Sequence, residues 1–451
     1  MIDFVKKYSV WEYLVIFILI FSFNSLFYHT HDFMLDFTHV YSISNGLTIY
    51  KDFNIVIGPI YPTLIALFLV IFGKNMFVFH IIHSIIVVGI YYLIKKNNKN
   101  TLSFFVFIIL HRVLFSKYNV FCLLLFYIIY YLEIGNYKYK DYLIGFLLGI
   151  TLFTKISIGV FLIIPTLILY YKKPKVIIKR LFLLLFVSLS IIIWMYFMGN
   201  LDAFFNYTIL GLFDFAGHTS NFFLDNILYI ILLIISFIYL MIHLKNNKYL
   251  SYMICFLIMS YSIFDESHVL LALFPTIVYV FDSFKQNTYL KKIIYVLSIF
   301  LFLVSIINVI IGNNYHKMDC KMSYCSQDKI IQNTFKRVHM VNLKLNKDYL
   351  DYYKYYFNDY AYFYKLDLKE DITPYDYIWV GNMGYHGEER IIKEIEKTCK
   401  NEKCLFVIDE DVLLKFKKSS FISYKILDYV NQNYKKKEYC YYKNATIYVN
   451  Q

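Results

Sequence analysis

IVIGPIYPTLIALFLVIF, residues 55–72, decides how this chain is arranged. The segment is as apolar as a membrane span, but Gly58, Pro59 and Pro62 interrupt its beginning. If it crossed a membrane, every later loop would change sides. The topology of the chain therefore depends on whether this segment crosses.

Apolar runs recur through the first two thirds of the chain. Of its 451 residues, 59% are hydrophobic, whereas soluble domains average nearer half. The longer runs suffice to cross roughly 30 Å of hydrocarbon, and the shorter ones need their flanking residues. The sequence thus predicts a polytopic α-helical membrane protein with about eleven spans. We place them near 10–27, 76–94, 101–116, 119–133, 141–154, 157–171, 181–199, 226–242, 249–264, 268–282 and 293–312.

Lysines mark one side of this arrangement. The net charge of +13 is attributed to basic loops that orient the protein in a membrane, not to nucleic-acid binding. The basic loops all fall on one side if 55–72 does not cross the membrane. The segment then either dips in and returns or lies along the interface. Its broken backbone, if it lies at membrane depth, must be buried in protein. We therefore predict a multi-pass cell-membrane protein with a cytoplasmic N-terminus and an extracytoplasmic C-terminus. The inner loops carry Lys6, Lys7, Lys95, Lys96, Lys99, Lys138, Lys140, Lys172, Lys173, Lys175, Lys179, Arg180, Lys245, Lys248, Lys285, Lys291 and Lys292.

Acidic residues collect on the opposite side. The first outer loop is expected over 28–75. Acidic residues contribute little to topology, so insertion alone does not explain this asymmetry. It suggests an outward-facing active site. The outer loops and their edges carry Asp32, Asp36, Asp52, Asp202, Asp214, Asp225, Asp265 and Glu266, with His218 and His268.

The composition changes near residue 313, where charged residues, Asn and Tyr become more frequent. Segments 376–382, 404–410 and 445–450 have the pattern of strands, and 388–400 that of an amphipathic helix. The strand, helix, strand order predicts a small α/β domain over 313–451, outside the membrane.

The tail also carries five of the seven cysteines. Two pairs have four residues between them, Cys320 with Cys325 and Cys399 with Cys404. They fit disulfides or free thiols, and Cys440 is left over. A zinc site with His316 lacks an evident fourth ligand. Cys122 and Cys255 lie in expected spans and are interpreted as packing residues.

Three segments carry a resemblance to a known family. Asp36 precedes NGLTIYKDFNIVIGPIYPTLIALFLVIFG at 45–73, GFLLGITLFTK lies at 145–155, and HVLLALFP lies at 268–275. Together they resemble the GT-C superfamily of integral-membrane glycosyltransferases. They are most similar to the branch that contains bacterial protein mannosyltransferases and aminoarabinose transferases.

The resemblance covers 10–312 and implies a GT-C-like transmembrane domain over 1–312. It implies a sugar donor linked to polyprenyl phosphate, bound among membrane lipids, and an extracytoplasmic glycan, lipid or protein as acceptor. The tail matches none of the family's motifs. The family's outer-loop acid is often followed by Glu, whereas Phe37 follows Asp36 here. This departure puts a paired-acid or metal role in doubt.

Transfer from a polyprenyl-phosphate sugar needs a base for the acceptor hydroxyl and positive charge near the departing phosphate. Asp36 is the candidate catalytic base, in a loop whose apolar surroundings favour proton uptake. A base on the face opposite the leaving group gives inversion. Lys155, between two apolar segments, either snorkels or pairs with an anion such as the donor phosphate. Arg112 and Lys117 could contact the same phosphate or lipid headgroups.

Weaker candidates for substrate or metal binding lie nearby in the sequence. Asp32 and Asp52 share the first outer loop with Asp36 and could equally close turns or cap helices. The group Asp265, Glu266 and His268 could bind donor, acceptor or a divalent cation, or form a solvated turn before a helix. A divalent cation in hard oxygen coordination fits such groups, but no spacing requires one.

Other classes of function remain open. A transporter or flippase for lipid-linked saccharides would also have many spans, but we see no internal repeat and few mid-span charges. A polymerase or ligase of lipid-linked saccharides is expected to have its large loop late in the chain. A receptor-like protein would depend on its tail.

Overall fold

A computed structural model describes most of the chain. The described residues are 2–26, 31–97, 117–214, 227–245, 247–259, 266–283, 347–357, 382–409, 423–437 and 445–449. The chain divides into two compact units, each of which is described by itself. The first unit comprises Met1–Asp36, Leu67–Ser190 and Phe222–Ile330, and the second comprises Phe37–Ala66, Ile191–Asn221 and Ile331–Gln451.

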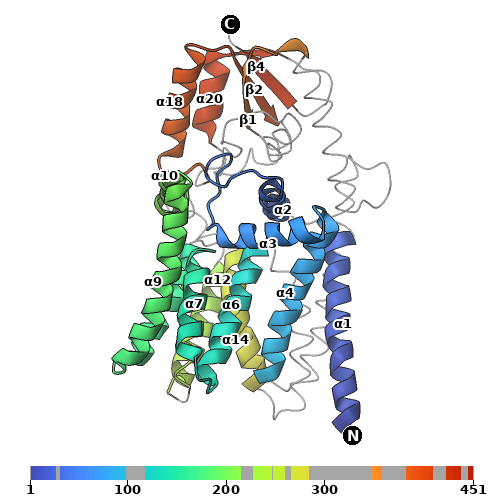
Figure 1. The fold of residues 1–451 in the computed structure, drawn as a ribbon, viewed down its shortest axis with the longest axis vertical. Helices are drawn as coiled ribbons and strands as arrows, with labels where there is room; N and C mark the ends of the chain where they lie inside the picture. The colour runs from blue at the N-terminus through green and yellow to red at the C-terminus, as the bar shows by residue number, and fades with distance from the viewer. Residues whose placement is uncertain are drawn as a thin grey trace. The chain divides into compact units, whose positions relative to one another are not determined.

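The first unit is built from helices that pack side by side (Figure 1). In the described part of the chain, three helical stretches are long and apolar enough to cross a membrane: Met76–Lys96, Lys117–Ile134 and Pro174–Phe197. Several other apolar helices are shorter. The helices are α1 (Ile2–Leu26), α4 (Met76–Asn97), α6 (Lys117–Ile134), α7 (Lys140–Leu152), α8 (Ile156–Tyr170), α9 (Pro174–Phe197), α12 (Ile227–His243), α13 (Leu250–Met259) and α14 (Glu266–Ser283).

This architecture agrees with a helical membrane protein. Each expected span from 10–27 to 268–282 overlaps one of these helices, except 101–116, which lies outside the described residues. The expected span 293–312 also lies outside them. The count of about eleven spans stays a prediction.

Glycines bring α7 close to its neighbours. A Cβ added at Gly145 would lie 2.2 Å from the carbonyl oxygen of Arg180, and one at Gly149 would lie 2.8 Å from Val187 Cβ, both on α9. A Cβ at Gly159 on α8 would lie 2.4 Å from Leu152 Cα. The glycine-spaced segment 145–155 is therefore a packing surface for its two neighbouring helices.

The first outer loop contains two helices, α2 (His31–Ser44) and α3 (Ile60–Phe72). Helix α3 has 13 residues, so it is about 20 Å long, shorter than the hydrocarbon core of a bilayer. Because α7, which overlaps an expected span, also has 13 residues, the expectation that 55–72 does not cross stays a prediction. Helix α2 was not predicted, because its mixture of aspartate, histidine and apolar residues resembles a loop.

The second unit contains a four-stranded sheet in the order β1-β2-β4-β3. Strands β1 and β2 are parallel, and β4 is antiparallel to both β2 and β3. Helices α18 and α20 lie side by side next to the sheet (Figure 1). The elements are β1 (Tyr353–Phe357), α18 (Gly387–Cys399), β2 (Cys404–Asp409), α20 (Tyr424–Asn433), β3 (Lys435–Lys437) and β4 (Ala445–Val449).

An apolar core joins this sheet to its helices. Tyr355 and Phe406 stack with ring centroids 5.1 Å apart, and Ile391, Ile395 and Val430 of the helices are fully buried against them. The parallel β1–α18–β2 unit is an α/β arrangement, and the predicted domain over 313–451 stays a prediction. Strands 404–410 and 445–450 and helix 388–400 are confirmed to within a residue, whereas the expected strand 376–382 lies outside the described residues.

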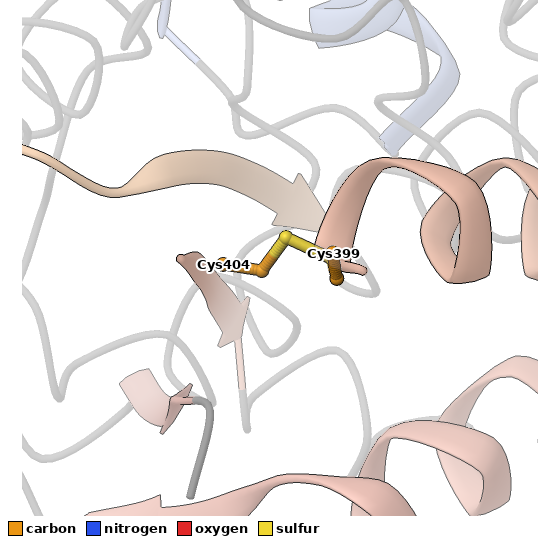
Figure 2. Close-up of a disulfide and its surroundings, with 2 residues drawn as sticks. All are labelled: Cys399 and Cys404. Atoms are coloured by element: carbon orange, nitrogen blue, oxygen red, sulfur yellow. A yellow bond between two sulfur atoms is a disulfide. The ribbon is translucent and has the colours of Figure 1, made fainter. Parts of the chain in front are cut away.

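For one of the two cysteine pairs, the disulfide alternative is the one present. Cys399, at the end of α18, is bonded to Cys404, at the start of β2 (Figure 2). Cys320, Cys325 and Cys440 lie outside the described residues, so the second pair and the zinc alternative stay predictions. Cys122 and Cys255 are buried free thiols in helices, as expected.

The second unit also contains a segment that follows α9. Short helix α10 (Leu201–Phe204) continues into a π-helical turn, η2 (Phe205–Leu210). Arg390 of α18 donates to Asn206 Oδ1 at 2.9 Å and to the Tyr207 hydroxyl at 3.0 Å. The Tyr50 hydroxyl lies 2.9 Å from Thr208 Oγ1. The second unit thus unites the tail with two segments from the expected outer loops.

Candidate functional site

Residues of α1, α2 and α14 and of the turn between α7 and α8 bring polar side chains to the beginning of α6. Lys117 is the first residue of α6, and its backbone N–H donates to Asp36 Oδ2 at 2.5 Å. Asp36 lies on α2 and is only 2% exposed. Because the first amides of a helix have no partner within the helix, a carboxylate at this position caps α6.

The Lys117 side chain faces α1. Its Nζ donates to Asn24 Oδ1 at 3.0 Å, and both residues are buried. Lys117 therefore places a buried amino group at the same helix end at which its backbone meets Asp36.

A second lysine reaches this helix end from the turn between α7 and α8. Lys155 Nζ donates to Asn119 Oδ1 at 2.9 Å and lies 2.8 Å from His268 Nε2. Because an ammonium group can only donate, His268 Nε2 accepts this hydrogen bond. Lys155 also lies over the ring of Tyr118, with Nζ 5.2 Å from the centroid.

The local sequence fixes the position of Lys155. Thr151 and Thr154 bond their hydroxyls to carbonyls one turn earlier, and α7 ends at Leu152. Lys155 then takes an extended conformation just before α8. Close packing of Gly159 against Leu152 keeps the turn tight. The side chain is thereby held against α6 and α14.

The two halves of the site share the first turn of α6. Asp36 contacts residue 117 and Lys155 contacts residue 119, so the two charged groups lie within roughly 15 Å of one another. Asp36 and Lys155 each contact the first turn of α6, and His268 contacts Lys155. Lys117, predicted as a second phosphate ligand, begins the same helix and contacts Asp36 through its backbone N–H.

The other predicted site residues divide into two groups. Asp52 Oδ2 accepts from the Thr48 backbone N–H at 2.5 Å, so this carboxylate closes its own turn. Asp32 lies on α2 one helical turn before Asp36, and Glu266 begins α14, but the described side chains include neither. Arg112 and Asp265 lie outside the described residues.

Sequence reasoning missed Asn24 and Asn119. Each accepts a hydrogen bond from a lysine of the site. The available signal was an amide side chain within an otherwise apolar run, which is costly in a membrane unless it has a polar partner.

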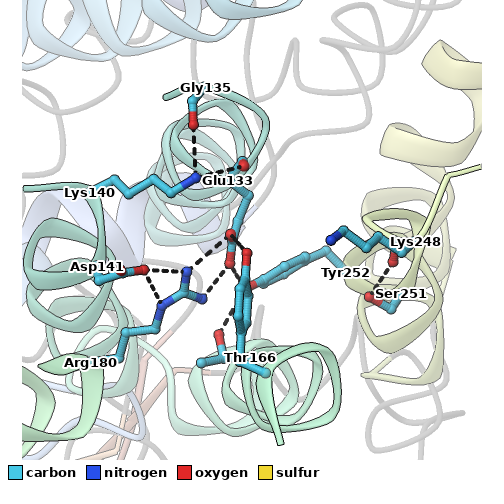
Figure 3. Close-up of polar contacts among 10 residues, drawn as sticks. Glu133, Gly135, Lys140, Asp141, Thr166, Arg180, Lys248, Ser251 and Tyr252 are labelled. Carbon is cyan, nitrogen blue, oxygen red and sulfur yellow. Dashed lines mark hydrogen bonds and ion pairs between the residues drawn. The ribbon is translucent and has the colours of Figure 1, made fainter. Parts of the chain in front are cut away.

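A second polar cluster lies at the other end of α6 (Figure 3). Glu133 Oε1 accepts from Arg180 Nη1 and from the Tyr252 hydroxyl, both at 2.5 Å. Its Oε2 accepts from Arg180 Nη2 at 3.1 Å and from the Tyr170 hydroxyl at 2.8 Å. Asp141 Oδ1 accepts from Arg180 Nε and Nη2 at 3.0 and 2.8 Å. This network joins α6, α7, α8, α9 and α13.

The two clusters differ in what they offer to a ligand. In the second, the charges of Arg180, Glu133 and Asp141 are directed at one another. The first combines two lysine side chains, a carboxylate and the positive end of the α6 dipole. Such a helix end favours an anion, and a nearby carboxylate can accept a proton.

Among the described residues, no group of three or more His, Cys, Asp or Glu side chains could hold a metal ion. Comparison of the chain with protein-family models, with curated proteins and with solved structures finds no match.

Proposed function

We propose that this protein is a membrane glycosyltransferase that moves a sugar from a polyprenyl-phosphate donor to an extracytoplasmic acceptor. The observation that carries the proposal is the convergence of Asp36, Lys117 and Lys155 on the first turn of α6. Residues 1–312 would form a GT-C-like domain of about eleven spans in the cell membrane. The acceptor would be a cell-envelope glycan, lipid or protein.

The proposed reaction is a direct displacement. Asp36 takes the proton of the acceptor hydroxyl, whose oxygen then attacks the anomeric carbon of the donor sugar. The bond between that carbon and the phosphate oxygen breaks on the opposite face, so the configuration inverts. The phosphate departs with the bonding electrons and gains negative charge. Lys155 and Lys117 stabilise this charge more strongly in the transition state than in the donor.

If Asp36 only caps α6, its replacement by asparagine should leave turnover unchanged. Asparagine retains an oxygen that can accept from the Lys117 amide, but it cannot take a proton from a hydroxyl. Asp36→Asn therefore preserves the cap of α6 and removes the base. We expect donor binding to be retained and turnover to fall at least about 100-fold, the usual contribution of a positioned general base.

The assay uses purified protein in lipid nanodiscs, a panel of polyprenyl-phosphate sugars and a cell-envelope extract as acceptor. Release of free polyprenyl phosphate reports transfer without knowledge of the acceptor. Asp202→Asn is the matched control, because Asp202 is an exposed acid on α10. If Asp36→Asn turned over as fast as the wild-type protein, the assignment of Asp36 as the catalytic base would be wrong.

Lys155→Gln separates phosphate binding from the chemical step. Loss of one charge-assisted hydrogen bond should weaken donor affinity roughly 10- to 100-fold, measured by direct binding of labelled donor. A transporter gives another outcome: labelled donor would move between leaflets without any release of polyprenyl phosphate. That result from the wild-type protein would overturn the proposed function.

A further inference from the structure

The basic end of the first unit carries exposed lysines next to tyrosine rings. Lys96 Nζ, at the end of α4, lies 4.6 Å from the ring centroid of Tyr131, near the end of α6. The Glu133 network joins the same end of α6 to the end of α8 and the beginnings of α7, α9 and α13. These contacts gather the expected cytoplasmic loops at one end of the helices.

Five exposed lysines at this end lie over tyrosine rings. We call them the lysine–tyrosine belt. The distances from Nζ to the ring centroid range from 4.6 to 5.6 Å. The belt consists of Lys96 with Tyr92 and Tyr131, Lys138 with Tyr139, Lys172 with Tyr171, Lys179 with Tyr142, and Lys248 with Tyr249.

Three acids at this end, whose side chains the structure describes, have basic partners other than the belt. Glu133 and Asp141 bind Arg180, which is fully buried. Glu12 on α1 binds Lys95, which is partly buried. Further exposed lysines, at 173, 175 and 245, lie on the same loops as the belt. The surface of this end is therefore strongly positive.

Apolar side chains adjoin the belt. Leu143 and Phe146 are exposed on α7, next to Tyr142, and Ile178 and Phe182 are exposed on α9, next to Lys179. A positive charge, an amphipathic ring and an apolar surface in succession match the headgroup and acyl regions of a lipid leaflet. A soluble polyanion such as nucleic acid would match only the positive charge.

We propose that the lysine–tyrosine belt binds the headgroups of anionic phospholipids. Each ammonium donates to a lipid phosphate, while the ring beneath it limits the positions that the flexible lysine side chain can adopt. The belt then gives this end a preference for an anionic leaflet. This inference is independent of the transferase activity, since it involves none of the residues assigned to that reaction.

The test measures lipid preference in nanodiscs of mixed phosphatidylglycerol and phosphatidylcholine. Native mass spectrometry counts the two lipids that stay bound to the released protein. A juxtamembrane lysine contributes about a fivefold preference for anionic lipid, so the double variant K138Q/K172Q should lose about 25-fold. K138R/K172R retains the charge and should keep most of the preference.

Two further variants make the result specific. Y139L/Y171L keeps both lysines but removes their rings, and it should lose part of the preference. K435Q/K436Q neutralises two exposed lysines on β3 and should change nothing. An unchanged lipid ratio in K138Q/K172Q, or an equal loss in K435Q/K436Q, would overturn the proposal. All substitutions are at exposed positions, so thermal unfolding in phosphatidylcholine should match the wild-type protein.

Discussion

Replacing Glu133 with alanine should destabilise the first unit strongly. The carboxylate of Glu133 is completely buried and accepts four hydrogen bonds, two of them from Arg180. Glu133→Ala leaves the buried guanidinium with Asp141 as its carboxylate partner and removes an acceptor from Tyr170 and Tyr252. Removal of one member of a buried ion pair destabilises by roughly 3–5 kcal/mol, and we expect a loss in this range.

A double variant separates the contribution of the two charges to stability from that of the volume that their side chains occupy. Glu133→Leu with Arg180→Met replaces the two fully buried charges by apolar groups of similar size, and Asp141, whose side chain is 20% exposed, is the charge of the network that remains. Such replacements are often neutral or stabilising. We therefore expect the double variant to be clearly more stable than Glu133→Ala, even though it changes more atoms.

Equilibrium unfolding in mixed micelles, followed by the fluorescence of Trp194 on α9, would measure these differences. Lys140→Met is the control, because Lys140 Nζ donates only to the carbonyls of Glu133 and Gly135 and should contribute about 1 kcal/mol. A loss below about 1 kcal/mol for Glu133→Ala, or a double variant as unstable as the sum of its single changes, would refute the reasoning.

Two further predictions concern packing and pH. Gly145→Ala places a Cβ 2.2 Å from the carbonyl oxygen of Arg180 and should destabilise the same unfolding transition by about 1–3 kcal/mol. Gly89→Ala, whose nearest neighbour would be Leu124 Cδ1 at 3.4 Å, should be nearly neutral. Burial lowers the pKa of His39 from 6.5 to about 3. Between these values the unfolded chain binds a proton that the folded chain excludes, so stability falls as the pH falls, by about 2 kcal/mol at pH 5. Hydrogen exchange of α2 should report this loss, and His39→Phe should abolish it; equal protection at pH 7 and pH 5 in the wild-type protein would contradict the assignment.

Hydrophobic patterning predicted much of the tail and the position of the helices. Residues 404–410, CLFVIDE, contain a short continuous run of apolar residues, and β2 forms there. Strand β1 escaped prediction because its sequence, YKYYF, has no strongly apolar alternation. Tyr355 is buried in the core, where it stacks on Phe406 of β2, a contact between distant segments.

The candidate site was predicted in part. Asp36 and Lys155 could be selected because charged residues beside apolar segments need a partner. Their common contact with α6 could not be derived, because it depends on how α1, α2, α8 and α14 pack together. Arg180 was interpreted as one more inner-loop cation. Its partner Glu133 was overlooked, although an acid near the end of an apolar helix is the signal to look for.

The disulfide between Cys399 and Cys404 reports the redox environment of the compartment in which the tail folded. The bond links residues only five positions apart, so it can close as soon as α18 and β2 form. Structural disulfides persist in oxidising compartments and are rare in the cytosol. Alkylation of the denatured chain, before and after reduction, would therefore reveal which side of the membrane the tail reached. That answer would not depend on the distribution of lysines, from which the topology was inferred.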